Sequence, residues 1–224
     1  MGKKMKKRAK EPIKAIIFDV GGVFALSKNP TTIKINNNRN HNFGVHEYIA
    51  KKLRIPLDQW FDSIDSVYAD AFEGRVSEEK TLSIISRNVK TNPYKLKKII
   101  LKAYKKNFNQ NKQLYRFAFK LKKQGYKIAI LSDQWWISKD AVIKPKYVKK
   151  FNVAIISCDV GLRKPNQEIY KIALKKLKLK PSECLFIDNQ SWNITPAKKL
   201  GMKTILFKTN KQLFKQLSKQ GVEI

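Results

Sequence analysis

The chain has 224 residues, and its 48 Lys and Arg residues outnumber its 17 Asp and Glu residues, which gives a formal net charge of +31 at pH 7. Apolar residues make up 42% of the chain and aromatic residues 11%, which excludes a wholly disordered basic tail because a hydrophobic core can form. The cations are 41 Lys and only 7 Arg, so both compositional bias and a polyanion-binding surface remain open as explanations of the charge.

Targeting and redox features favour a soluble protein of a reducing compartment. Cys158 and Cys184 provide neither a disulfide framework nor the spacing of a metal site. Basic residues within 1–10 precede an apolar run, as in a signal peptide, but Lys14 and Asp19 interrupt that run and no cleavage pattern follows. No stretch approaches the roughly 20 apolar residues of a membrane helix. We therefore expect a cytoplasmic protein with no membrane partner and a disordered basic segment at 1–10.

Five short apolar runs predict the strands of a sheet. They lie at Ile13–Phe18, Lys127–Leu131, Val153–Ser157, Cys184–Ile187 and Thr204–Phe207. Continuous apolar runs of this length are typical of strands that are buried on both faces. Amphipathic segments of helical length alternate with these runs, at Lys112–Gln124, Lys139–Lys150, Gln167–Leu179, Trp192–Leu200 and Lys211–Gln220. The alternation predicts an α/β fold with a parallel, Rossmann-like sheet.

More than a hundred residues without a strand signal separate the first two predicted strands. They begin with a polar stretch, Ser27–Asn42, which we expect to form a surface loop. Four helices are predicted after it, at Val45–Leu53, Leu57–Phe72, Ser77–Val89 and Pro93–Tyr104. The predicted organisation is therefore an α/β core of residues 11–27 and 108–224, into which residues 28–107 are inserted as a linker and a helical cap.

Polar residues follow four of the predicted strands, at the edge of the sheet where ligands gather in open α/β folds. Gly21 and Gly22, close behind the first of these residues, let the backbone approach a ligand. Two carboxylates suit Mg²⁺, which takes one or two protein carboxylates, and a hydroxyl and an ammonium can hold phosphate oxygens. The set therefore predicts a metal and a phosphate at one site, built from Asp19, Ser132, Lys164 and Asp188.

The segments around these residues resemble the four motifs of the haloacid dehalogenase (HAD) superfamily. Asn193 and the run Ala197–Met202 extend the fourth motif in the manner of this family, and Glu73–Glu79 resembles its cap signature. The similarity covers residues 13–207 and points to phosphatase-like members of subfamily IA, which carry a helical cap after the first strand. The four segments are Ile16–Val23, Ile130–Ser132, Gly161–Pro165 and Leu185–Asn189.

The resemblance implies a Mg²⁺-dependent phosphomonoester hydrolase that acts on a small phosphorylated metabolite through an aspartyl-phosphate intermediate. Asp19 is the implied nucleophile, and Ser132 and Lys164 are the implied partners in catalysis that bind the phosphate together with Gly22. The implied metal ligands are Asp19, the backbone carbonyl of Gly21 and Asp188, with Asn189 and Asn193 around them.

Three positions depart from the pattern of similar sequences. Gly21 stands where many family phosphatases have an Asp that serves as general acid and base, a function worth about 10²–10⁴-fold in rate. Asp133 replaces a common Asn and adds an anion near the phosphate. Asn189 replaces a common second acid, which removes one negative charge from the surroundings of the metal.

Two other functions stay open as alternatives. One is a catalytically weak or inactive HAD-like scaffold that binds nucleic acid or other polyanions nonspecifically, because the 53 residues from Lys80 to Ser132 contain 15 cations and no acid. The other is a haloacid dehalogenase, which fits less well because those enzymes need no metal and typically lack an acid at the position of Asp188. The oligomeric state is expected to be a monomer or a homodimer.

Overall fold

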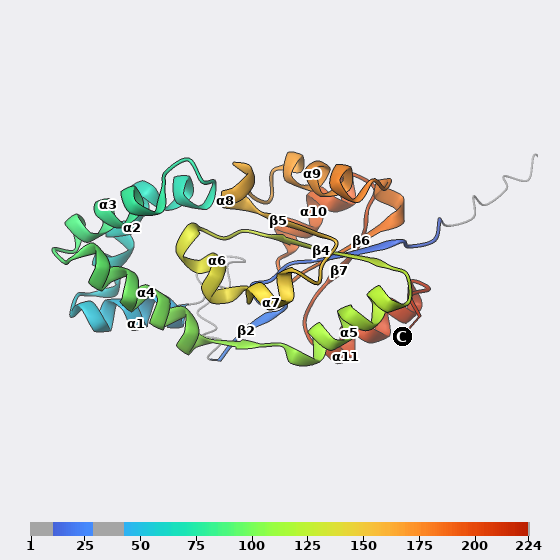
Figure 1. Ribbon diagram of the computed structural model, residues 1–224, viewed down its shortest axis with the longest axis horizontal. Coiled ribbons are helices and arrows are strands. Elements are labelled where there is room, and N and C mark those ends of the chain that lie inside the picture. The colour runs from blue at the N-terminus through green and yellow to red at the C-terminus, as the bar shows by residue number, and fades with distance from the viewer. Residues whose placement is uncertain (1–10, 29–42, 224) are drawn as a thin grey trace, which may run out of the picture.

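The computed structural model describes residues 11–28 and 43–223, which fold around a parallel sheet (Figure 1). The strands of the sheet follow the order β5-β4-β1-β6-β7, and every neighbouring pair is parallel. The predicted α/β fold class and all five predicted strand positions are confirmed. The five strands are β1 (Ala15–Phe18), β4 (Lys127–Ser132), β5 (Val153–Ile156), β6 (Cys184–Asp188) and β7 (Lys203–Leu206).

Alternate side chains of the central strand β1 face two different layers of helices. Ile16 and Phe18 belong to an apolar cluster with helices α5 (Lys112–Lys123), α7 (Pro145–Val148) and α11 (Asn210–Lys219). Ala15 and Ile17 belong to a second cluster with helices α9 (Gln167–Leu177) and α10 (Ser191–Lys199). The sheet is thus covered on both faces, which explains why its strands read as continuous apolar runs.

The predicted helix at Lys139–Lys150 is wrong, because two short helices occupy this region. Helix α6 spans Trp136–Val142, and α7 begins only at Pro145. A proline disfavours helical geometry in the residue before it, and Lys144 is accordingly extended, with φ −64° and ψ 122°. Two further short helices, α8 (Ser157–Val160) and η1 (Pro181–Glu183), flank α9 in the sequence.

Four helices between β1 and β4 form a separate apolar cluster. They are α1 (Phe43–Leu53), α2 (Leu57–Phe72), α3 (Glu78–Asn88) and α4 (Pro93–Asn107), close to the predicted bounds. Ser77 caps α3 by accepting a hydrogen bond from the backbone N–H of Lys80, as the Ser-Glu-Glu pattern suggests. Trp135 and Ile137, which follow β4, are buried in the same cluster. The part of the molecule that is built around the parallel sheet, called the sheet half below, therefore contributes side chains to this helical core.

An antiparallel pair of strands closes the two ends of the insert, and the sequence did not predict it. Strand β2 (Ala25–Ser27) pairs with β3 (Phe108–Gln110), with Ala25 opposite Gln110. Three residues are too few to show a period of two, so these strands leave no pattern in the sequence. The pair places the start and the end of the insert side by side.

Several sequence predictions lie outside the described residues. These are the disordered segment at 1–10 and most of the surface loop at Ser27–Asn42, and they stay predictions, as do the boundaries between core and cap. In the part of the chain that the structure describes, no helix is both long enough and apolar enough to cross a membrane.

The loop between α2 and α3 rests directly on the backbone of the sheet half. At Gly74, where φ is +65°, an added Cβ would lie 2.1 Å from the carbonyl oxygen of Cys158 in α8. Two contacts flank this point: Arg163 Nε lies 3.5 Å from Glu73 Oε1, and Trp136 Nε1 donates a hydrogen bond to the carbonyl of Val76. Only glycine allows this approach of the insert to the sheet half.

We expect Gly74→Ala to lower stability by more than the cost of its backbone conformation. A left-handed alanine costs about 1–3 kcal/mol, and overpacking against the Cys158 carbonyl adds about 1–3 kcal/mol. Gly221→Ala is the matched control, because φ there is +79° but nothing lies within 4 Å of the added Cβ. Urea unfolding of both variants measures the difference, and equal losses would show that the contact at Gly74 is unimportant.

Candidate functional site

Three neighbouring strands bring their polar end residues to one edge of the sheet. Phe18 of β1 is aligned with Ile130 of β4 and with Ile187 of β6. Asp19 therefore emerges between the ends of the two strands that finish with Ser132 and Asp188. The backbone N–H of Asp19 donates to the carbonyl of Ile187, which fixes the start of the turn that follows. This register places Asp19, Ser132 and Asp188 at the same edge of the sheet, where the sequence analysis expects the site.

Lys164 links the two carboxylates in the interior of the protein. Its Nζ lies 2.8 Å from Asp19 Oδ1 and 2.7 Å from Asp188 Oδ2. Exposure is only 4% for Lys164, 6% for Asp19 and 0% for Asp188. Ion pairs this far from solvent need good geometry and further hydrogen bonds to offset the loss of hydration. The three predicted charged residues of the site therefore form one buried network.

The other hydrogen bonds to the carboxylate oxygens of Asp188 are donated by residues at the start of α10. The backbone N–H of Gln190 donates to Asp188 Oδ1 at 2.7 Å, and Asn193 Nδ2 donates to Oδ2 at 3.1 Å. Tyr170 Oη in α9 holds Asn193 through its backbone carbonyl at 2.8 Å. Asp188 is thus oriented by a helix start and a buried tyrosine, and the predicted partner Asn193 touches it directly.

Electrostatics in this network favour a charged lysine and a carboxyl that binds protons readily. Burial raises the pKa of Asp19 from 3.8 to about 7, Asp188 adds to this rise, and Lys164 opposes it. Burial alone would lower the pKa of the Lys164 ammonium. The carboxylates of Asp188, Asp19 and Asp133 outweigh that effect and raise this pKa well above its usual value.

The turn after Asp19 is shaped for close backbone contact with the fourth motif. The carbonyl of Val20 accepts hydrogen bonds from the backbone of Val23, Phe24 and Ala25, which folds the chain back at once. Gly22 has φ +78°, and a Cβ on it would lie 2.3 Å from Asn189 Nδ2. The predicted Gly22 and Asn189 are therefore in contact, and glycine is required at position 22 for this approach.

A buried polar network surrounds Ser132, and most of its members were missed by the sequence reasoning. Gln134 Nε2 donates to Ser132 Oγ at 3.2 Å, and Ser138 Oγ donates to Gln134 Oε1 at 2.8 Å. Ser157 Oγ exchanges hydrogen bonds with the backbone of Gln134. The only signal in the sequence was that these polar residues follow the apolar strands β4 and β5, whose carboxyl ends lie near the site.

Asp133 supports the loop that carries Lys164 through a hydrogen bond to its backbone. Its Oδ1 accepts a hydrogen bond of 3.0 Å from the backbone N–H of Lys164. Burial raises the pKa of Asp133, while Lys164 opposes this shift. The acid that replaces the common Asn is therefore held by the backbone of the Lys164 loop.

A comparison with protein families supports the resemblance stated from the motifs. Residues 13–201 match the family model for haloacid dehalogenase-like hydrolases. The chain is a haloacid dehalogenase-like hydrolase. It is similar in fold to a HAD family enzyme of Bacteroides thetaiotaomicron, with a TM-score of 0.73 and 19% identity, covering 91% of this chain and 99% of that one.

Curated relatives match only parts of this hydrolase. Rat bifunctional epoxide hydrolase 2 is 34% identical over 114 residues, which are 49% of this chain and 21% of that protein. The glyceraldehyde 3-phosphate phosphatase of Pyrococcus furiosus is 34% identical over 98 residues, which are 41% of this chain and 39% of that protein. The chain thus spans about a fifth of the length of the first of these relatives and two fifths of the second.

The residues at the sheet edge of this HAD-like hydrolase fit a hard divalent cation. No group of three or more His, Cys, Asp and Glu side chains suited to a metal occurs among residues 11–28 and 43–223. Mg²⁺ does not need one, because it binds one or two carboxylates and keeps waters and substrate oxygens as its other ligands. Asp19 and Asp188 supply the carboxylates, and the buried amide oxygens of Asn189 and Asn193 have no partner among the described residues. Unpaired buried oxygens are suited to a cation or to its waters.

We expect Lys164→Met to destabilise the metal-free protein strongly, because it leaves two buried carboxylates without their cation. Breaking a buried pair in this way costs about 3–5 kcal/mol. The folded-state pKa of Asp19, about 7, already exceeds the unfolded value of 3.8, so stability falls as pH rises between them. Without the ammonium this pKa rises further, so the difference between variant and wild type is expected to be larger at pH 8 than at pH 5.

Urea unfolding in EDTA at both pH values measures this effect. Lys171→Met is the matched control, since Lys171 forms an exposed pair with Glu168 and little change is expected. A loss for Lys164→Met that is independent of pH would contradict the assigned ion-pair network.

Proposed function

We propose that the chain is a Mg²⁺-dependent phosphomonoester hydrolase that acts on a small phosphorylated metabolite. The observation that carries this proposal is the buried arrangement of Asp19, Lys164 and Asp188 at the carboxyl edge of the sheet. Two comparisons support it: the Pyrococcus relative is a named phosphatase, and the Bacteroides enzyme with the same fold has been crystallised with magnesium and inorganic phosphate.

In the proposed reaction, Asp19 supplies the nucleophile. One carboxylate oxygen of Asp19 forms a bond to phosphorus while the bond from phosphorus to the leaving oxygen breaks, which gives an aspartyl-phosphate and an alkoxide that takes a proton from water to become the alcohol. Water then hydrolyses this acyl phosphate, and inorganic phosphate and the free carboxylate result. Covalent catalysis of this kind divides one difficult displacement into two easier steps.

Charge neutralisation is the main task of the other residues. Asp19, Asp188 and the Gly21 carbonyl would hold Mg²⁺, which supplies positive charge against the anionic phosphate when it is bound. Lys164 carries a permanent ammonium at the same place, and the hydroxyl of Ser132 is held by Gln134 in a buried network. We infer that both groups bind phosphate oxygens and stabilise the charge that develops on them.

We propose that α1–α4 act as the cap that covers the leaving group. Tyr68 of α2 interacts electrostatically with Arg163 and Asp133 of the sheet half, and burial raises its pKa to about 12, so its phenol stays protonated. Tyr104 of α4 accepts a hydrogen bond of 3.0 Å from Trp135 Nε1 at the same junction. These polar groups favour a leaving group that carries hydroxyl or carbonyl oxygens over an apolar one.

The dehalogenase alternative is less well supported, because Asp188 is retained and lies within 2.7 Å of the same lysine as the nucleophile. A dehalogenase needs no metal, so a second buried carboxylate there would only add a cost of burial. The alternative of a catalytically weak or inactive scaffold rests on the basic segment Lys80–Ser132, and Gly21, which replaces the general acid of many family phosphatases, is consistent with it.

A phosphatase assay with Asp19→Asn tests the proposal. We expect the wild type with Mg²⁺ to hydrolyse p-nitrophenyl phosphate or members of a phosphometabolite panel, and EDTA to abolish this activity. Loss of the nucleophile should lower kcat by about 10³-fold or more. Asp140→Asn, a change at an exposed acid, is the matched control and should keep full activity. Inactivity of the wild type toward the whole panel would exclude the proposed function.

We expect Gly21→Asp to increase the rate for substrates with poor leaving groups. A Cβ at Gly21 would meet only Asp19 Oδ2, at 4.0 Å, so the backbone accepts a side chain here without a clash at Cβ. General acid catalysis is worth about 10²–10⁴-fold, and a gain of about 10²-fold in kcat is expected for an alkyl phosphate. The gain should be smaller for p-nitrophenyl phosphate, whose leaving group needs no proton. Gly21→Asn is the control without an acid, and an equal gain for both variants would contradict this explanation.

A further inference from the structure

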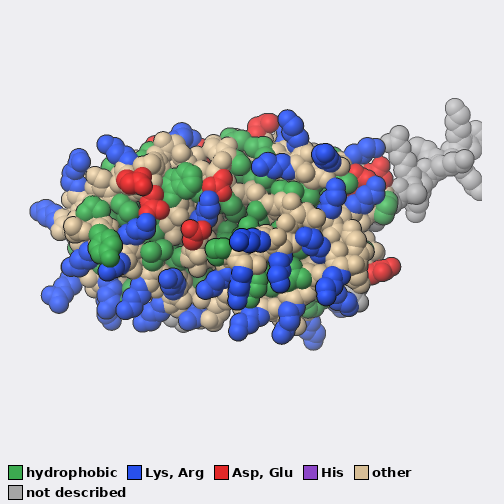
Figure 2. Space-filling view, in the orientation of Figure 1, with side chains coloured by type: hydrophobic (Ala, Val, Ile, Leu, Met, Phe, Trp, Pro, Cys, Tyr) green, Lys and Arg blue, Asp and Glu red, His purple; other side chains and the backbone are tan. Residues whose placement is uncertain are grey.

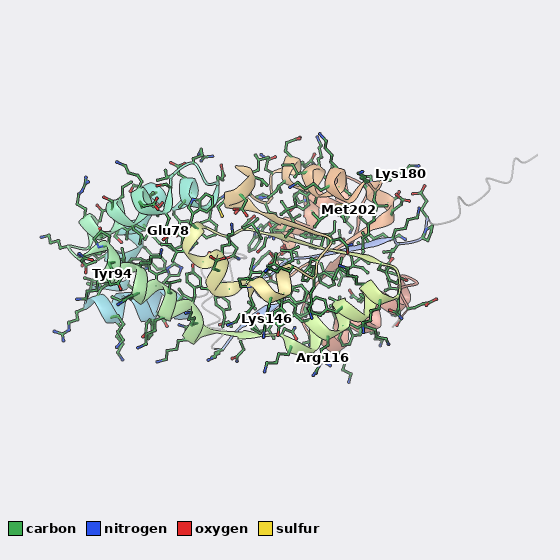
Figure 3. The ribbon with its side chains drawn as sticks, in the orientation of Figure 1. Glu78, Tyr94, Arg116, Lys146, Lys180 and Met202 are labelled. Carbon is green, nitrogen blue, oxygen red and sulfur yellow. The ribbon has the colours of Figure 1, made fainter. Side chains whose placement is uncertain are left out.

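The exposed cations are distributed unevenly over the two helical layers of the sheet half. Helices α5, α7 and α11 contain nine Lys and Arg residues and no acid, whereas α9 and α10 contain five Lys and one Glu. In Figure 2, acidic side chains gather mainly in the upper part of the view, while blue side chains line the lower edge. Figure 3 places Arg116 and Lys146 toward that lower edge and Lys180 at the opposite, upper edge.

Helices α5, α7 and α11 form one continuous surface. The rings of Tyr115 in α5 and Tyr147 in α7 stack with centroids 4.1 Å apart, and Phe117 in α5 lies 4.4 Å from Phe214 in α11. Helix α5 therefore lies between the other two. We call six of the exposed cations on these three helices the basic face: Lys112, Arg116, Lys120, Lys146, Lys211 and Lys215.

The cations of the basic face have no acidic partners. None of the six forms an ion pair with any residue in the described part of the chain, whereas Lys97, Lys139 and Lys171 elsewhere each pair with an acid. Mutual repulsion of unpaired cations destabilises a folded protein and is relieved when an anion binds. An anionic ligand on the basic face would therefore stabilise the folded protein.

The starts of α5 and α11 add further positive potential to the basic face. Asn111, which caps α5, donates a hydrogen bond of 2.8 Å to Asn210 at the start of α11. The two helix N-termini thus lie together, and Lys112 and Lys211 occupy their first turns, where no acid is present. Cations at this end oppose the helix dipole and cost stability unless an anion lies nearby.

We propose that the basic face binds the phosphodiester backbone of nucleic acid. Lys112 and Lys120 are eight residues apart on one helix, or about 12 Å at 1.5 Å per residue, so the cations are spread along a line instead of converging on one phosphate. The phosphates of one duplex strand advance about 3.4 Å along the helix axis per nucleotide, so a line of this length spans several of them. Lys predominates over Arg, which fits backbone contacts and not the bidentate reading of bases.

An anionic membrane fits the basic face less well. Surface-binding elements insert apolar side chains beside their cations. The large apolar side chains that are exposed among the described residues are Tyr94, at 68%, and Leu206, at 37%, and they lie on α4 and β7 instead of on the basic face. The site at the carboxyl edge takes no part in this binding, so the proposal holds whether or not the chain is a phosphatase.

Fluorescence anisotropy with a labelled 20-nucleotide single-stranded RNA and a 20-base-pair DNA duplex tests the proposal. The logarithm of affinity is expected to fall linearly with the logarithm of salt concentration, with a slope of about −3 or steeper for the single strand, since each contact contributes about −0.7. A slope near zero, or no binding to either probe at about 0.1 M salt, where phosphate contacts dominate, overturns the proposal.

Two triple variants distinguish the effect of the basic face on binding from the effect of total charge. Arg116→Gln with Lys120→Gln and Lys215→Gln removes three cations of the face, and should weaken RNA binding at about 0.1 M salt about 100-fold and reduce the slope by about 2. Lys175→Gln with Lys176→Gln and Lys198→Gln removes three exposed cations from α9 and α10 and should leave binding within about threefold, because these do not touch the phosphates.

Thermal unfolding by circular dichroism verifies that both variants fold like the wild type. Equal weakening by the two triple variants would show that only net charge matters, and would overturn the proposal. Binding to phosphatidylserine vesicles that depends on the basic face, without RNA or DNA binding, would assign the face to lipid and overturn it as well.

Discussion

The ion pairs of one buried lysine with two buried aspartates are the interaction on which the site depends. Lys164 Nζ lies within 2.8 Å of both Asp19 and Asp188, which come from motifs 145 and 24 residues away in the sequence. A carboxylate that loses water in the protein interior needs a partner, so these contacts hold only if β1, β6 and the loop before α9 keep their mutual positions. The fold holds these three segments in fixed positions relative to one another. The parallel register of β1 and β6 contributes most to this arrangement, because it aligns the strand ends that carry the two aspartates.

The strands and the end residues of the site could be predicted from the sequence, because their signals are local. An apolar run that ends in Asp or Ser needs no knowledge of the rest of the chain, and parallel strands bring such ends to one edge. The support around the site could not be predicted in this way. Gln134 reaches Ser157 only because β4 and β5 are neighbours, and Asp133 accepts a hydrogen bond from the backbone of Lys164, 31 residues later. Such contacts join residues that are distant in the sequence, so the spacing of neighbouring residues does not reveal them.

The junction between the cap helices and the sheet half is also a product of tertiary packing. Trp135 and Ile137 follow β4 in the sequence, yet they are buried in the apolar cluster of α1–α4, where the ring of Phe72 stacks on Trp135. Movement of these helices away from the sheet half would expose two large apolar side chains and remove the hydrogen bond of Trp135 to Tyr104. Burial of this size costs about 1.5–3 kcal/mol per side chain to undo. The junction therefore resists wide opening, and motions that admit a substrate are expected to be small or to leave α6 with the cap helices.

The site is rich in acidic residues, whereas the surface of the same chain is strongly basic. Burial of the acidic residues explains how the two can coexist. Asp19, Asp133 and Asp188 meet a single ammonium at the sheet edge, while the protein as a whole carries +31. Solvent and salt screen exposed lysines beyond roughly 8–10 Å, whereas buried carboxylates are screened far less and interact at close range. The carboxylates can therefore attract a divalent cation even though the surface is strongly basic. The same surface raises the local concentration of anionic ligands, so a phosphorylated substrate is drawn toward a molecule that holds three acids where the proposed metal would bind.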